Sequence, residues 1–186
     1  MQQLDRSSTA WSGRLGWLAA LLATSLIFSL GLACAVPLAG LAALAAWRQS
    51  RRDALLCIAA VWLVNQCVGF AALGYPLDLP TLGWGVALGA AALAATWAAS
   101  GLSRRTRGLG GATLVFVAAF AVYEGLLWSV TQAVGATTVA YQPLIVARIL
   151  ALNGATFAGL LAASAFQARA DRHAVPEVAR PPQPHA

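Results

Sequence analysis

Residue composition and charge spacing place this chain in a membrane. It has 186 residues, of which 60% are hydrophobic and 10% are charged. Soluble domains carry about 25% charged residues, so this composition excludes a globular protein with a fully hydrated surface. No charge interrupts three long intervals, which run from Arg14 to Arg48, from Asp53 to Asp78 and from Asp78 to Arg104. Each exceeds the roughly 20 residues that a helix needs to cross a bilayer, and together they predict an all-α, polytopic transmembrane helix bundle.

The net charge of +6 follows from arginines that lie between apolar stretches. The positive-inside bias of membrane proteins accounts for basic residues in such positions, so we expect no nucleic-acid partner. All twelve basic residues are arginine. Together with the alanine and glycine content, this usage is typical of a high-GC bacterial coding bias and favours a bacterial inner membrane.

The first apolar segment, residues 15–47, has two possible arrangements. As one helix it would extend about 50 Å, well beyond the roughly 30 Å hydrocarbon core. Pro37 lies past its middle, where proline kinks or breaks a helix. We favour a hairpin that turns near residues 34–37, although its second arm, 36–47, looks too short to cross unaided. This arrangement predicts six membrane-embedded segments, and a single helix over 15–47 would give five spans.

Four further segments are clear transmembrane candidates, and glycine and proline mark the connections between them. Pro143 suits the first position of the last helix, because proline is tolerated there. The predicted spans cover residues 54–73, 81–100, 110–134 and 143–167.

Arginine positions predict the orientation of these spans. If they alternate, the arginines near 48–52, near 104–107 and after 168 all fall on one face, and the loops at 74–80 and 135–142 contain no basic residue. The arginine-bearing face is then cytoplasmic. We expect a cytoplasmic N-terminal segment over 1–14, a transmembrane domain over 15–167 and a disordered, proline-rich cytoplasmic tail over 168–186, with both termini inside.

Residue types that support metal binding or catalysis are scarce. No histidine lies in any predicted span, which excludes a haem held between two transmembrane histidines. Cys34, Cys57 and Cys67 lack the Cys-x-x-Cys spacing of a metal or redox site. The sequence contains no nucleophile beside a base, no carboxylate pair and no phosphate-binding glycine loop. We therefore expect neither a cofactor nor an enzymatic activity.

Two ionisable residues, Glu124 and Arg148, fall inside predicted spans, where such groups are costly and usually face a bundle interior or a cavity. At about 1.5 Å per residue, Glu124 lies about 15 Å from the outer end of its helix, near the midplane. Arg148 lies about 7.5 Å in, within reach of either the outer interface or Glu124. Asn65, Gln66 and Asn153 fall at depths close to that of Glu124.

These polar groups predict the wall of a small outward-open pocket rimmed by aromatic residues. Arg148 and Asn153 lie roughly 140° apart around their helix, so both cannot point at Glu124. A structural alternative is that the same residues only form interhelical hydrogen bonds, each worth about 0.6 kcal/mol, and a further alternative is that Glu124 carries protons. The candidate ligand-binding residues are Asn65, Gln66, Tyr123, Glu124, Trp128, Arg148 and Asn153.

The leading functional hypothesis is a transport or substrate-capture component that binds a small polar solute. It would need a proton gradient acting through Glu124 or a separate energising partner. In size and layout the chain resembles the substrate-binding subunits of energy-coupling-factor vitamin transporters. The alternative is a non-catalytic subunit or assembly factor of a larger inner-membrane complex, contacting partner membrane subunits. A lipid-modifying or sensing protein is the least favoured hypothesis. Small residues such as Gly85 and Gly89 favour close helix packing, either within the chain or against a partner.

Overall fold

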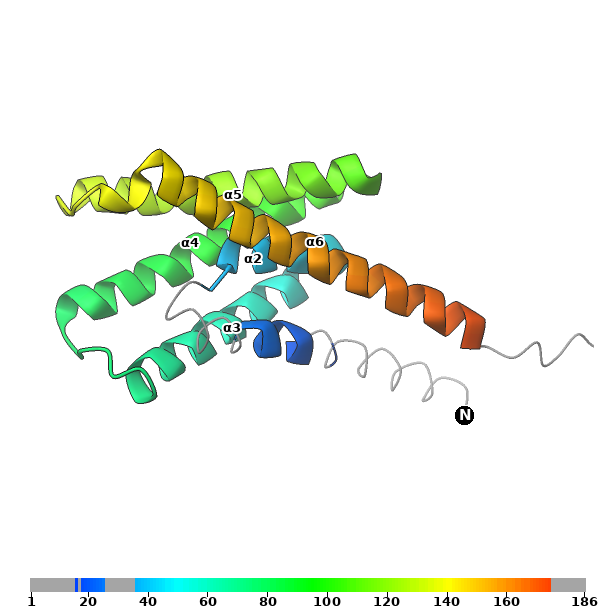
Figure 1. The fold of residues 1–186 in the computed structure, drawn as a ribbon, viewed down its shortest axis with the longest axis horizontal. Coiled ribbons are helices and arrows are strands. Elements are labelled where there is room, and N and C mark those ends of the chain that lie inside the picture. Colours follow the sequence, from blue (N-terminus) through cyan, green and yellow to red (C-terminus); the bar gives the residue numbers. More distant parts are fainter. Residues whose placement is uncertain (1–15, 17, 26–35, 175–186) are drawn as a thin grey trace, which may run out of the picture.

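The part of the chain that the structure describes is entirely helical outside its connections. The structure is a computed structural model that describes residues 16, 18–25 and 36–174, with side chains up to residue 166. Figure 1 shows the helices as an elongated bundle. The named elements are α2 (Leu38–Arg48), α3 (Arg51–Ala71), α4 (Leu79–Ser103), α5 (Gly108–Ala133), the 3-10 turn η1 (Val139–Tyr141) and α6 (Pro143–Ala174).

Four of these helices, α3 to α6, are long and apolar enough to cross a membrane. By helix length and hydropathy the chain is therefore a multi-pass membrane protein, as its composition predicts. Their bounds lie within a few residues of the predicted spans, except at the end of α6. Pro143 is the first residue of α6, as expected.

Residues 15–47 do not form one continuous helix. Pro37 has φ −77° and ψ 61°, which is not helical, and the Leu38 N–H bonds to the Val36 carbonyl oxygen at 2.8 Å. This geometry is that of an inverse γ-turn. The five-span alternative, with one helix over 15–47, is therefore wrong. Of the hairpin turn predicted near residues 34–37, residues 34 and 35 lie outside the described residues.

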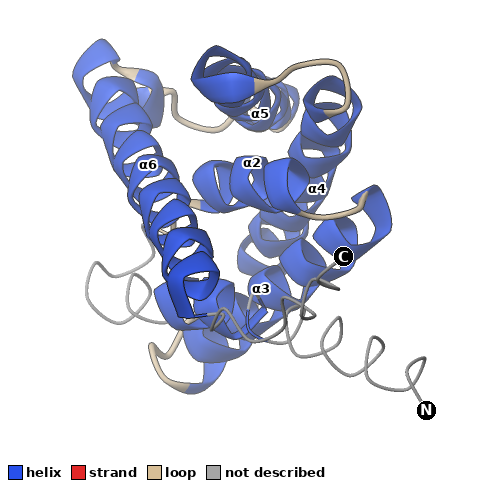
Figure 2. Ribbon diagram, turned by 90° about the vertical axis from the view of Figure 1, so that its right-hand side faces the viewer, coloured by secondary structure: helices blue, strands red, loops and turns tan. Residues whose placement is uncertain are grey.

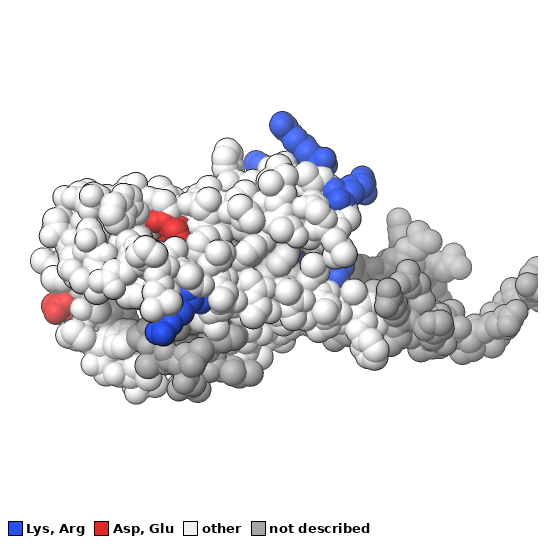
Figure 3. Space-filling view, turned by 45° about the horizontal axis from the view of Figure 1, so that its top comes forward, with Lys and Arg blue, Asp and Glu red and all other residues white. Residues whose placement is uncertain are grey.

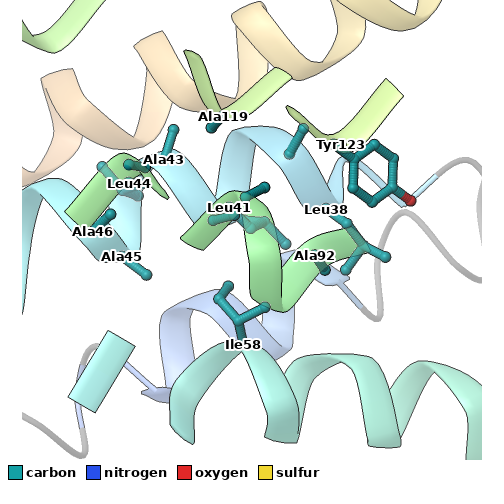
Figure 4. Close-up of a cluster of buried hydrophobic side chains, with 14 of the residues drawn as sticks. Leu38, Leu41, Ala43, Leu44, Ala45, Ala46, Ile58, Ala92, Ala119 and Tyr123 are labelled. Atoms are coloured by element: carbon teal, nitrogen blue, oxygen red, sulfur yellow. The ribbon is translucent and has the colours of Figure 1, made fainter. Parts of the chain in front are cut away.

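The short helix α2 occupies the centre of the bundle. Its eleven residues span about 16 Å, half the thickness of a bilayer core. It packs against α3, α4, α5 and α6, and Figure 2 shows it lying between the longer helices. Every residue from Leu38 to Ala46 is buried. Figure 4 shows α2 side chains, among them Leu38, Leu41 and Leu44, in one cluster with Ile58, Ala92 and Ala119, which come from three different helices.

Helix α6 holds α2 at both ends. Near the start of α2, the Gly40 N–H donates to Asn153 Oδ1 at 2.8 Å. At its end, Arg48 Nη2 donates to Ser164 Oγ. The earlier residue of α2 pairs with the earlier residue of α6, and the later residue with the later one. The two helices therefore run parallel over this contact.

Small residues allow α3 and α4 to pack closely. The Trp62 Nε1–H donates to the Gly85 carbonyl oxygen at 2.8 Å, and the Trp62 ring lies so close to Gly89 that a Cβ there would be 2.6 Å from it. Gln66 Oε1 would likewise lie 2.5 Å from a Cβ on Gly85. The Gly85 and Gly89 spacing is thus used for packing within the chain.

Helix α6 continues to Ala174, past its expected end at residue 167. Residues 168–174, expected to belong to the disordered tail, are therefore helical in the structure, and residues 175–186 lie outside the described part. Alanine and arginine in this stretch are good helix formers. The first proline of this stretch, Pro176, disfavours helical backbone at the residue before it and removes the hydrogen bond to residue 172. Nothing local therefore ends the helix at residue 167.

Arginines gather at one end of the bundle, which we call the arginine end. It is formed by the start of α3 and the connection from α4 to α5, with Arg51, Arg52, Arg104, Arg105 and Arg107. In the view of Figure 3 most basic atoms lie toward one end and acidic atoms surface toward the other. The opposite end is formed by the α3–α4 loop, η1 and the start of α6.

Candidate functional site

A cavity of about 500 Å³ lies toward the end of the bundle opposite the arginine end. Its wall combines residues of α4, α5, η1 and α6 with the backbone break before α2. Its volume is in the range of small-molecule binding sites. The polar and aromatic lining residues are Trp84, Tyr123, Glu124, Thr131, Thr137, Tyr141 and Asn153, and the apolar ones are Val36, Leu88, Leu127, Ala136, Ala140, Ile149 and Leu152.

Helix α5 contributes the largest share of the polar wall. Tyr123, Leu127 and Thr131 are spaced four residues apart, so they share one helix face, and all three are buried. Glu124 follows Tyr123 and lies at the edge of this face, half-buried and in contact with the cavity. The helix therefore presents a carboxylate at the cavity rim beside two hydroxyl groups.

Arg148 does not meet Glu124. It is exposed, and it is not among the cavity-lining residues. The reason is the rotation of α6, which turns Asn153 toward α2 and so carries Arg148 about 140° away around the helix. Within the described part of the chain, the Glu124 carboxylate has no ion-pair partner.

Asn153 has a structural partner as well as a place on the cavity wall. It is 3% exposed, and its amide oxygen accepts the Gly40 N–H at 2.8 Å. Its Nδ2 donates to the Ile149 carbonyl oxygen at 2.9 Å. Pro37, at the N-cap position of α2, has no side-chain hydrogen-bonding group, so Asn153 provides from α6 the cap that the local sequence lacks.

Asn65 and Gln66 do not line this cavity. Both belong to α3, and Gln66 lies against Gly85 of α4. Their predicted depth matches that of Glu124, but α3 packs on a different side of α4. The expected convergence of three helices on one polar layer is therefore not formed, and α3 contributes nothing to the wall.

Trp128 lies behind the cavity wall. It is 40% exposed and contacts the Tyr141 ring edge to face, with centroids 4.7 Å apart and planes at 81°. Tyr141 Oη is 3.3 Å from Thr131 Oγ1. Trp128 and Thr131 thus both hold Tyr141, which joins η1 to the end of α5.

Four polar or aromatic lining residues, Trp84, Thr131, Thr137 and Tyr141, are not among the candidates from the sequence. Trp84 lies near the start of the span predicted over 81–100, and Thr137 and Tyr141 fall in the loop at 135–142. The candidates Glu124 and Trp128 lie four positions apart on one face of α5, whereas the buried face is formed by Tyr123, Leu127 and Thr131. The spacing of Tyr123, Leu127 and Thr131 could have indicated this face.

Comparisons of the chain with protein-family models, with curated proteins and with solved structures found no match. The functional proposal therefore rests on the chemistry of the cavity.

Proposed function

We propose that the protein is an integral membrane transport or substrate-capture component that binds a small solute in the cavity beside Glu124. The observation that carries this proposal is the cavity itself, with a volume of about 500 Å³ and a wall that combines one carboxylate, several hydroxyl groups and an amide with apolar side chains. Ionisable groups inside membrane proteins commonly mark solute or ion pathways. Apolar walls with a few polar groups are typical of small-molecule sites.

The backbone break before α2 supports this location. Non-helical backbone within a membrane protein is tolerated where it is buried in protein or borders a cavity, and interrupted helices surround the solute sites of many transporters. Val36 precedes the turn at Pro37 and lines the cavity. The backbone break at Pro37 and the Glu124 carboxylate therefore border the same cavity.

The charge distribution supports capture from outside the cell. The arginine end would face the cytoplasm of a bacterial inner membrane under the positive-inside rule, with the end of α6 on the same side. The cavity would then face outward. Movement of a bound solute would require either proton transfer at Glu124 or a separate energising partner.

Ligand-dependent stabilisation tests the proposal. The full chain is purified in a non-ionic detergent, and its melting temperature is measured against a panel of small metabolites. A ligand at 100 times its Kd stabilises a protein by about 2.7 kcal/mol, which raises the melting temperature. Glu124→Gln should reduce this response and Arg148→Gln should leave it unchanged. A response that survives Glu124→Gln and disappears in Arg148→Gln would place the site elsewhere.

A second candidate function is a subunit of a larger membrane complex, and the exposure of α6 favours it. In its apolar part 17% of residues are buried, against 44% for α4. Small residues cover much of its exposed surface, including Ala151, Ala155, Ala158 and Gly159, and such surfaces allow close helix packing. Co-purification with fixed partners and no ligand response would favour this role over solute capture.

A further inference from the structure

The charge on the cavity wall has one sign. Among the described residues that line the cavity, Glu124 alone carries a full charge when ionised, and neither arginine nor lysine is present. An anionic solute would therefore meet a carboxylate without a compensating cation. A cationic solute would meet a carboxylate placed to pair with it.

The Glu124 carboxylate also has no counter-charge among the residues that the structure describes. Arg148, the other ionisable residue in a predicted span, is exposed and outside the cavity. Within the described part of the chain, no side chain forms a hydrogen bond or ion pair with the Glu124 carboxylate. An ionised carboxylate in an apolar setting is costly without a partner, and a bound cation would supply that partner.

The start of α2 does not provide a binding site for an anionic solute. Helix N-termini attract anions through unsatisfied N–H groups. Here the Leu38 N–H bonds to Val36 and the Leu41 N–H to Pro37, while the Gly40 N–H bonds to Asn153. The N–H groups that could hold an anion are largely used within the protein.

Aromatic side chains on the wall favour a cation as well. Trp84 from α4, Tyr123 from α5 and Tyr141 from η1 all line the cavity. Aromatic faces attract ammonium groups, and tryptophan does so most strongly. Trp128 supports Tyr141 from behind. Leu88, Ile149 and Leu152 add apolar surface that can pack against the carbon part of a solute.

We propose that the solute is an organic cation, namely a protonated amine or quaternary ammonium group attached to an apolar body. Glu124 pairs with the positive charge, Trp84 and the two tyrosines contact it through their rings, and the aliphatic wall takes the apolar body. This inference rests on the proposed solute capture and specifies the chemical class of the solute.

Three probes that share a benzyl group and differ in charge test it on the full chain in non-ionic detergent. They are benzyltrimethylammonium, benzyl alcohol and phenylacetate, with affinity measured by calorimetric titration and by melting temperature. We expect the cation to bind the wild type at least tenfold more tightly than either of the others. Glu124→Gln should abolish this preference, and Trp84→Leu should weaken cation binding about fivefold. Arg148→Gln is the matched control and should bind like the wild type.

The wild-type comparison decides the proposal even if a variant fails to fold. Equal affinity for the three probes, or a preference for phenylacetate, would overturn the cation proposal and leave solute capture standing. A cation preference that persists in folded Glu124→Gln would also overturn it. If only a neutral or anionic metabolite stabilises the protein, the solute class is wrong. If no probe and no metabolite has an effect, both proposals fail.

Discussion

The side chain of Asn153 accepts a hydrogen bond from the backbone of Gly40, across 113 positions of the chain. This contact caps a helix that begins inside the bundle, where water cannot satisfy its first N–H groups. Proline at the cap position has no side-chain donor or acceptor, so the acceptor must come from another helix. The start of α2 therefore depends on the placement of α6.

Replacing Asn153 with leucine should destabilise the protein by about 1–3 kcal/mol, because it leaves the buried Gly40 N–H without an acceptor. The measurement is the free energy of unfolding in mixed detergent and SDS. Thr156→Val is the matched control on the same helix, since the Thr156 hydroxyl bonds only within α6, to Leu152. The control should change stability by less than about 1 kcal/mol. Equal stability of the two variants would show that the cap is dispensable.

Gly40→Ala should be destabilising for a steric reason. A Cβ at Gly40 would lie 2.5 Å from the backbone oxygen of Asn153, so α2 and α6 would have to separate, at a cost of about 1–3 kcal/mol. Gly125→Ala on α5 is the control, because a Cβ there meets nothing within 4 Å. That change should be neutral or stabilise by up to about 1 kcal/mol. Thermal unfolding of both variants checks the difference, and similar melting temperatures would contradict close α2–α6 packing.

Trp62→Phe should weaken the contact between α3 and α4. It removes the Nε1–H that donates to the Gly85 carbonyl oxygen and part of the ring that covers Gly89. We expect a loss of about 1–2 kcal/mol in unfolding free energy. Trp97→Phe provides the comparison, since Trp97 is 58% exposed and phenylalanine keeps an aromatic face for Arg51. A larger loss for Trp97→Phe would contradict this account of the contact.

Asp78 should make the start of α4 sensitive to acid. Hydrogen bonds from Thr81 lower the pKa of its carboxyl below the ordinary value of 3.8. A lowered pKa in the folded state means that the ionised cap stabilises the helix above pH 3.8, and that this contribution is lost as the pH falls through the folded pKa. Amide exchange of Thr81, corrected for its intrinsic rate, should therefore speed up in acid. Asp78→Asn should retain the cap and lose the pH dependence.

The long helices could be predicted from the sequence because their signal is local. Apolar runs of bilayer length, glycine turns and Pro143 identify each span without reference to any other. The break at Pro37 was predictable for the same reason, because proline fixes its own backbone and removes a donor.

The cavity could be predicted only in part. Glu124 and Asn153 stood out because polar groups in apolar runs are rare, and their depth follows from counting residues. Which residues share a cavity depends on helix rotation and on which helices are neighbours. Asn65 lies at nearly the same predicted depth as Glu124, but it belongs to α3, which does not line the cavity. Tyr141 lies in a connection without periodicity. It lines the cavity, and contacts with Thr131 and Trp128 hold it there.

The enclosure of α2 has a consequence for how the protein is made. The four helices that surround α2 all follow it in the chain, and the groups that hold its two ends belong to the last of them. During synthesis α2 enters the membrane before any of these neighbours exists, and its length does not anchor it across the bilayer. Its final position is therefore fixed only when α6 has been inserted. A nascent chain released before α6 is made would contain α3, α4 and α5, but it would lack the hydrogen bonds that hold the two ends of α2.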